Sequence, residues 1–155
     1  MRISFKLNGR DVTCEARDNI SLLDLLRREL GVKSVKKGCD QGECGACTVL
    51  LDGSPVNSCL ILAPKLEGRE VTTVEGLQKD PIMRRLVDSF IEDGAIQCGF
   101  CTPGMLLSAY ALLRDNQRPT IDEVKRAIVG NLCRCTGYVN IVKAILDASE
   151  RIRDE

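Results

Sequence analysis

The stretch KKGCDQGECGACTVLLDG, residues 36–53, places Cys39, Cys44 and Cys47 in the spacing C-x4-C-x2-C. That spacing, with a fourth cysteine later in the chain, is typical of plant-type [2Fe-2S] ligation. Glycines at positions 38, 42 and 45 let the backbone fold tightly and present amide N–H groups to cluster sulfur atoms. Cys59 follows a predicted turn and strand and completes the set. The spacing favours an iron–sulfur site over the alternative, a structural zinc site with four cysteine ligands.

Around this stretch, alternating apolar and polar residues predict short strands. They are expected at 3–7, 12–16, 47–51, 55–62 and 69–74. Asn8-Gly9 supplies the tight turn of the first hairpin. SLLDLLRRELG, residues 21–31, predicts one helix with Ser21 as its N-cap. A small mixed sheet packed on one helix indicates a ubiquitin-like or ferredoxin-like β-grasp over residues 1–76.

After Gly76 the apolar period changes from that of a strand to that of a helix. Helices are expected over about 80–93, 102–114, 120–130 and 138–151. Their short connections predict a compact four-helix bundle, so residues 77–155 form a second domain. The predicted fold class is therefore α+β, with a plant-ferredoxin-like β-grasp domain followed by a four-helix bundle.

A second set of cysteines lies in the helical part, as Cys98 and Cys101 in QCGFCTPG and as Cys133 and Cys135 in NLCRCTGY. Each pair precedes a predicted helix N-terminus, where unpaired N–H groups and the helix dipole favour an anionic cluster. Zinc remains an alternative for this set taken alone. A redox dithiol is disfavoured for CGFC, because a predicted helix rather than a strand precedes it.

Composition excludes several function classes. The chain has 22 Lys and Arg, 22 Asp and Glu, and no His, which argues against a nucleic-acid surface, a Ser-His-Asp triad and any Cys/His metal site. Nine cysteines and no apolar signal segment predict cytoplasmic thiols, and no stretch is long enough for a membrane span. Cys14 is interpreted as a small buried hydrophobe, and the charges at 27–29 and 33–37 as solvated.

Four motifs in order resemble the iron–sulfur small subunit of the molybdenum hydroxylases, the xanthine dehydrogenase and aldehyde oxidoreductase family, which also includes carbon monoxide dehydrogenase and 4-hydroxybenzoyl-CoA reductase types. They are KKGCDQGECGACTVLLDG, NSCL, GAIQCGFCTPGM and GNLCRCTGY. The resemblance implies two [2Fe-2S] clusters, one held by Cys39, Cys44, Cys47 and Cys59 and the other by Cys98, Cys101, Cys133 and Cys135. It also implies that Gln97 and Cys135 approach a molybdopterin.

The same resemblance implies a role without substrate chemistry in this chain. Electrons would pass from molybdopterin in a large subunit through both clusters to FAD in a medium subunit, in a heterotrimer or a dimer of heterotrimers. The substrate would be a purine, an N-heterocycle or an aldehyde. Two other hypotheses stay open at this point: an independent two-cluster ferredoxin-like carrier, and a zinc-stapled structural module.

Overall fold

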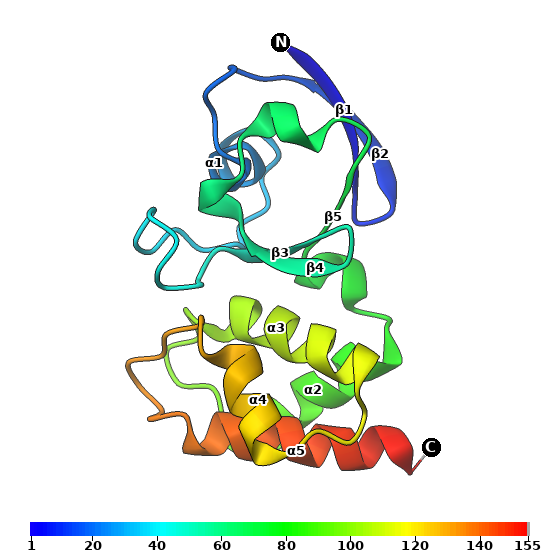
Figure 1. The fold of residues 1–155 in the computed structure, drawn as a ribbon, viewed down its shortest axis with the longest axis vertical. Coiled ribbons are helices and arrows are strands. Elements are labelled where there is room, and N and C mark those ends of the chain that lie inside the picture. Colours follow the sequence, from blue (N-terminus) through cyan, green and yellow to red (C-terminus); the bar gives the residue numbers. More distant parts are fainter. Residues whose placement is uncertain (155) are drawn as a thin grey trace.

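A computed structural model describes residues 1–154 of the chain. A strand-containing part and a helical part are stacked, with the sheet above α3 in Figure 1. The strands are β1 (Arg2–Leu7), β2 (Arg10–Glu15), β3 (Thr48–Leu51), β4 (Ser54–Asn57) and β5 (Glu70–Thr72). The α-helices are α1 (Leu22–Asp24), α2 (Pro81–Glu92), α3 (Thr102–Asp115), α4 (Ile121–Ile128) and α5 (Val139–Arg153). The expected α+β class is confirmed.

The strands form one mixed sheet in the order β2-β1-β5-β3-β4. β1 pairs with β2 in antiparallel register, Ile3 opposite Cys14 and Phe5 opposite Val12. The expected turn is present, because Asn8 and Gly9 both have positive φ. β5 then runs parallel to β1 and antiparallel to β3, and so joins the two hairpins into one sheet. This crossing of the chain through the centre of the sheet gives the β-grasp arrangement.

The single helix expected over 21–31 is wrong in detail. Ser21 caps the start as predicted, with its Oγ accepting the Asp24 N–H at 3.1 Å. After α1 the chain continues as a π-helical segment, Leu25–Glu29, in which the Leu30 N–H bonds the Leu25 carbonyl at 3.1 Å. The wider turn accompanies the complete burial of four leucines, Leu22, Leu23, Leu25 and Leu26. Together they form a broader apolar face than the single stripe of an amphipathic α-helix.

The strand expected over 55–62 is also wrong in its second half. β4 ends at Asn57, and Ser58–Leu60 forms a 3-10 turn. The Ser58 N–H and hydroxyl both donate to the Cys47 carbonyl, at 3.3 and 2.7 Å, which bends the chain out of the sheet. Alternation in the sequence continues through this bend, so periodicity alone did not show it. The bend brings Cys59 beside Cys47.

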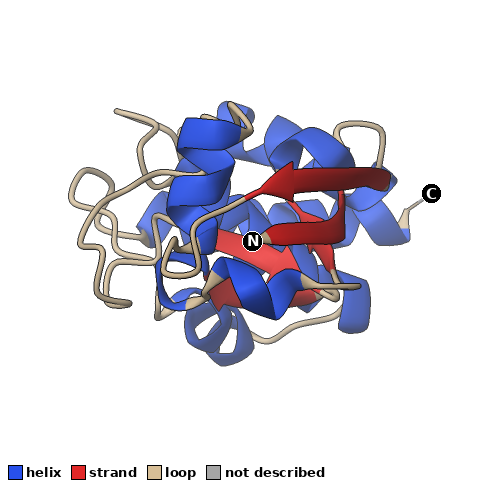
Figure 2. Cartoon of the chain, turned by 90° about the horizontal axis from the view of Figure 1, so that it is seen from above, coloured by secondary structure: helices blue, strands red, loops and turns tan. Residues whose placement is uncertain are grey.

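The four predicted helices of the second part are present, within a few residues of their expected ends. At α2, for example, the Asp80 carboxylate accepts the N–H groups of Ile82 and Met83 at 2.9 and 3.2 Å. Among residues 1–154, no helix combines the length and the apolar character needed to cross a bilayer. Seen from above, the strands overlie the helices (Figure 2).

Two apolar cores lie on opposite sides of the sheet. One packs beneath α1 and contains Ile3, Phe5 and Val49, and the other lies within the helices and contains Phe90 and Leu107. Every residue of β3 is buried, because this strand is covered on both faces. Leu50 belongs to the helical core although it lies in the sheet. The two parts therefore share a packed interface rather than a flexible link.

Candidate metal centres

The loop after residue 37 turns its backbone N–H groups toward one sulfur. The Cys39 Sγ accepts from the N–H groups of Gln41, Glu43 and Cys44 at 3.4, 3.3 and 3.4 Å. These backbone hydrogen bonds lower the pKa of Cys39 to about 7. Because a thiolate is the form that binds metal, the lowered pKa makes Cys39 a better metal ligand, and it results from the loop's own N–H groups.

At two of the glycines in this loop, an added Cβ would force a neighbouring side chain to move, and at Gly42 it would also strain the backbone. A Cβ on Gly38 would lie 2.7 Å from the Cys44 Sγ. Gly42 has a φ of +80°, and a Cβ there would lie 2.4 Å from a methyl carbon of Leu60. The glycine-rich sequence was expected to allow close approach of backbone to sulfur, and the geometry agrees with that expectation.

The four thiols of the first site approach one another in pairs. Cys39 lies against Cys44, and their contact contributes to the lowered pKa of Cys39. Cys59 lies against Cys47, and burial, followed by hydrogen bonding to the Cys47 thiol, raises the pKa of Cys59 to about 12. Cys47 immediately precedes β3 and Cys59 lies in the 3-10 turn after β4, so one pair is attached to the sheet and the loop carries the other.

The second site joins the loop before α3 to the loop before α5, which lie on the same side of the molecule (Figure 1). Cys101 is the N-cap of α3 and is buried enough that desolvation, followed by its contact with Cys133, raises its pKa to about 12. The Cys135 thiol donates a hydrogen bond to the Cys98 sulfur, which raises the pKa of Cys135. Cys98 and Cys135 are exposed, whereas Cys101 and Cys133 are partly covered. This site therefore has an inner pair and an outer pair.

The loop that carries Cys133 is held by its own polar groups. The Cys133 N–H donates to the Tyr138 hydroxyl at 2.9 Å, and the Cys133 Sγ lies 3.1 Å from the Thr136 Oγ1. Burial opposes ionisation of Cys133, but hydrogen bonds from Thr136 and from the backbone outweigh it and lower its pKa. Tyr138 begins α5 with a φ of +70°, so the chain turns sharply from this loop into the helix.

Paired thiols are the donor arrangement of a binuclear cluster. Each iron of an all-cysteine [2Fe-2S] cluster takes two thiolates, so a site needs two pairs rather than four sulfurs around one point. Both sites have two pairs, Cys39/Cys44 with Cys47/Cys59 and Cys98/Cys135 with Cys101/Cys133. Residues 1–154 contain no group of three or more acidic or cysteine side chains positioned around a single metal ion. The donors present fit two [2Fe-2S] clusters.

The two sites are joined by contacts that the sequence analysis did not identify. The Leu132 N–H donates to the Cys44 carbonyl at 2.9 Å, so the loops of the two sites are hydrogen-bonded directly. The buried Asn131 side chain donates to the Gly45 carbonyl at 3.2 Å. An Asn two residues before a Cys was a visible signal, but its partner lies 86 residues away and no local pattern indicates such a pairing.

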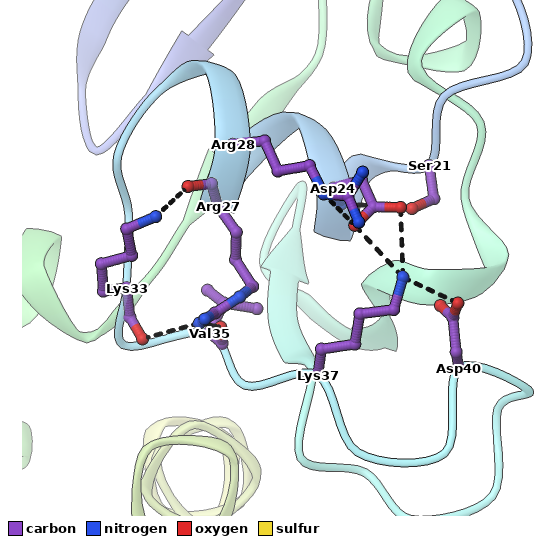
Figure 3. A network of polar contacts seen from close by, with 8 residues as sticks. All are labelled: Ser21, Asp24, Arg27, Arg28, Lys33, Val35, Lys37 and Asp40. Atoms are coloured by element: carbon purple, nitrogen blue, oxygen red, sulfur yellow. Dashed lines mark hydrogen bonds and ion pairs between the residues drawn. The ribbon is translucent and has the colours of Figure 1, made fainter.

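Two basic side chains, Arg27 and Lys37, which were interpreted as solvated, hold the first loop in place. Arg27 Nη1 donates to the Val35 carbonyl at 2.7 Å, and the Lys37 ammonium lies 3.2 and 2.8 Å from the carboxylates of Asp24 and Asp40 (Figure 3). These bonds connect the first helical segment to the residues that flank Cys39. The interpretation of solvated charge is therefore wrong for Arg27 and Lys37.

Comparisons with known proteins agree with this geometry. Residues 5–77 match the family model described as a 2Fe-2S iron-sulfur cluster binding domain, and residues 73–146 match the one described as a [2Fe-2S] binding domain. The chain is 48% identical over 149 residues to the nicotinate dehydrogenase small FeS subunit of Eubacterium barkeri, covering 96% of this chain and 95% of that protein. The chain belongs to the iron–sulfur subunits of the molybdenum hydroxylase family. It therefore carries two [2Fe-2S] clusters, and the zinc alternative is not supported.

Solved structures of this family share the fold. Quinoline 2-oxidoreductase from Pseudomonas putida 86 matches with a TM-score of 0.93 and 46% identity, over 99% of this chain and 96% of that one. The aldehyde oxidoreductase of Desulfovibrio desulfuricans matches with a TM-score of 0.91 and 41% identity, over 99% of this chain but only 17% of that one. The iron–sulfur subunit fold is thus found both as a chain of similar length and as part of a much longer one.

Proposed function

We propose that this chain is the electron-transfer subunit of a molybdenum hydroxylase. Cys39, Cys44, Cys47 and Cys59 ligate the cluster of a ferredoxin-like domain at residues 1–76, and Cys98, Cys101, Cys133 and Cys135 ligate the cluster of the helical domain at 77–155. Each cluster, when bound, accepts and gives up an electron. The observation that carries the proposal is the arrangement of eight thiols as four pairs in two sites joined by the Leu132–Cys44 hydrogen bond.

The exposure of the helical site supports the direction of electron flow that we propose. Gln97, Cys98 and Cys135 are all exposed at the helical site, so a partner's cofactor can approach this site closely. We assign Gln97 and Cys135 as the residues that face molybdopterin in a large subunit. Electrons then leave through the first site to FAD in a medium subunit. This arrangement requires a heterotrimer or a dimer of heterotrimers, and we place it in the cytoplasm.

The substrate we propose for the complex is an N-heterocycle with a pyridine-type ring. Two relatives support this choice, since nicotinate and quinoline are named in the enzymes that are 48% and 46% identical to this chain. The aldehyde oxidoreductase match is 41% identical. Purines and aldehydes are therefore the alternatives to test. This chain contributes electron transfer to the reaction and no group that acts on the substrate.

Purification from the native host with a tag on this chain tests the proposal. We expect a brown complex with about four iron and four acid-labile sulfide atoms per chain, as two [2Fe-2S] clusters require. A molybdopterin subunit and an FAD subunit should co-purify. A lone two-cluster protein would instead support the independent ferredoxin-like carrier, and a colourless protein would exclude both. Turnover of nicotinate, xanthine and benzaldehyde by the same preparation distinguishes the substrate classes.

A further inference from the structure

Asn131 lies where the first cysteine loop and β3 meet the helical part of the chain. It follows α4 and precedes Cys133 by two residues, and only 4% of its surface is exposed. Its amide Nδ2 donates to the Gly45 carbonyl and to the Thr48 Oγ1, each at 3.2 Å. Its Oδ1 accepts from the Ser108 hydroxyl at 2.7 Å. One side chain thus bonds the first cysteine loop, β3 and α3 together.

The backbone around Asn131 is packed without room for larger residues. A Cβ on Gly45 would lie 2.1 Å from the Gly130 carbonyl oxygen, and a Cβ on Gly104 would lie 2.5 Å from the Gly45 carbonyl oxygen. Gly45 also has a φ of +71°, which an L side chain rarely adopts. Backbone of the first loop, of α3 and of the segment before Cys133 is therefore in direct contact. Small movements here cannot be absorbed by side chains.

The neighbouring backbone bond connects this packing to the ligands. The Leu132 N–H donates to the Cys44 carbonyl at 2.9 Å, and Leu132 is bonded covalently to Cys133. The Asn131 bond to Gly45 is adjacent to it, since Asn131 precedes Leu132 by one residue and Gly45 follows Cys44 by one residue. These adjacent bonds fix the segment of the second site against the segment of the first. Because the Asn131 amide is buried, each of its bonds would be costly to leave unmade.

We propose that Asn131 is a positioning residue for electron exchange between the two clusters, which it serves by holding the Cys44 and Cys133 segments at a fixed separation. A single electron moves from the helical site to the first site, and no bond forms or breaks. The rate of such a step depends on the separation and contact of the two ligand sets. Asn131 touches neither set of thiols and alters only their relative placement. This inference rests on the proposed function and its ligand assignment.

The test uses the complex purified with its partner subunits. Asn131→Ala and Asn131→Asp both remove the two donated bonds, and Asp keeps the shape and the acceptor for Ser108. Ser108→Ala is a milder variant that removes the bond from α3 alone. Arg114→Met is the matched control, because Arg114 donates to the Gly53 carbonyl at 2.9 Å and so also joins the two parts, at a place remote from the Asn131 bonds.

Electron paramagnetic resonance of the dithionite-reduced complex reports both clusters and the magnetic interaction between them. We expect the Asn131 variants to keep both cluster signals at full intensity, to change the splitting caused by that interaction, and to slow electron exchange several-fold in rapid-freeze experiments. Ser108→Ala should show a smaller change in the same direction, and Arg114→Met should match the wild type.

Three results would overturn the inference. The first is an Asn131 variant with both clusters, unchanged splitting and unchanged exchange rate. The second is an Arg114→Met complex that changes as much as the Asn131 variants, since the effect would then be general loosening of the interface. The third applies if the Asn131 variants fail to assemble: it is a Ser108→Ala complex whose splitting and exchange rate match the wild type. A wild-type complex that lacks the two clusters would contradict the proposed function itself. Failure of the proposed function can therefore be distinguished from failure of this inference.

Discussion

At the scale of single residues, the cysteines of one site differ in how readily they ionise. Cys39 has a pKa lowered by backbone N–H groups, whereas burial raises the pKa of Cys59 and of Cys101. Metal binding must therefore overcome different costs of ionisation within one site. Cys14 packs against the edge of the first core and burial raises its pKa, but it is half-buried rather than buried as the interpretation of a small buried hydrophobe expected.

Cys101→Ser should remove or destabilise the cluster of the helical site and leave the first cluster in place. Cys101 is the more buried member of its pair, and a hydroxyl is a poor replacement for a thiolate ligand on iron. Paramagnetic resonance of the reduced complex should lose one of two signals, with iron falling by about half. Cys14→Ser is the matched control and should keep both signals. An intact pair of clusters and normal turnover in Cys101→Ser would contradict the ligand assignment.

At the scale of elements, helices begin where nearby side chains accept hydrogen bonds from the free backbone N–H groups of the first turn. α4 begins with a capping box, in which the Thr120 Oγ1 accepts the Glu123 N–H at 3.2 Å and the Glu123 carboxylate accepts the Thr120 N–H at 2.7 Å. The position of α4 matters because the chain passes from it directly into Asn131. Local capping thus contributes to the placement of the second cysteine loop.

Thr120→Ala should lower the stability of the chain by about 1 kcal/mol, the usual cost of losing an N-cap hydroxyl. For a chain of this length that corresponds to a fall of about 2–4 °C in the melting midpoint. Circular dichroism at a helix wavelength measures it. Thr120→Ser keeps the hydroxyl and should melt like the wild type. Equal losses in both variants would show that the cap is not the cause.

The contact between α2 and α5 carries a carboxylate pair with a pH-dependent effect. A hydrogen bond from Lys143, at 2.6 Å, lowers the pKa of Asp93. Burial, followed by the hydrogen bond and charge of Asp93, raises the pKa of Asp147, and Lys143 at 3.7 Å opposes this only in part. Because the folded-state pKa of Asp147 is raised, its favourable contribution is complete below the unfolded value and is lost as pH rises through the folded pKa.

Asp147→Asn should therefore stabilise the protein at neutral pH, since the amide can replace the protonated acid without ionising. The gain in melting midpoint over wild type should shrink as pH falls through the raised folded pKa of Asp147 toward its unfolded value. Asp115→Asn is the opposing control, because a hydrogen bond from Arg114 lowers the pKa of Asp115. It should lose stability at neutral pH. A gain in Asp147→Asn that does not change with pH would contradict the linkage.

At the scale of the whole molecule, β3 couples the two domains. It alternates between cores, with Leu51 in the first and Leu50 in the helical core. Both are at most 3% exposed, although they are neighbours in sequence. Because β3 is covered on both faces, separating the sheet from the helices would expose its apolar side chains to water. The two cluster sites are consequently placed by one shared interface.

Leu50→Ala should weaken this coupling at a cost of roughly 2–5 kcal/mol, as for other buried leucines. Calorimetry of the wild-type chain should show one transition, and Leu50→Ala should broaden or split it because the helical part loses contact with the sheet. Leu51→Ala is the matched variant with the same atoms removed from the first core. It should lower the transition without splitting it. Splitting in both variants would contradict a special role for Leu50 in the interface.

Much of the fold and the eight proposed ligands could be predicted from local signals. The turn residues at 8 and 9 and the N-cap at Ser21 act within a few residues, and the structure confirms both. The cysteine spacings are similarly local and led to the two sites. The errors occurred where a distant contact overrides periodicity, as at Ser58, whose bonds to Cys47 end β4 early.

The α+β class, the two sets of cysteines and the family could be predicted from the sequence, because these depend on patterns within short segments. The pairing of the thiols, the bonds by which Arg27 and Lys37 hold the first loop and the contact of Asn131 between the two sites became visible only in the folded chain. Such contacts link residues up to 86 positions apart. They depend on how β3 and α3 pack, and no local preference of the chain specifies that packing.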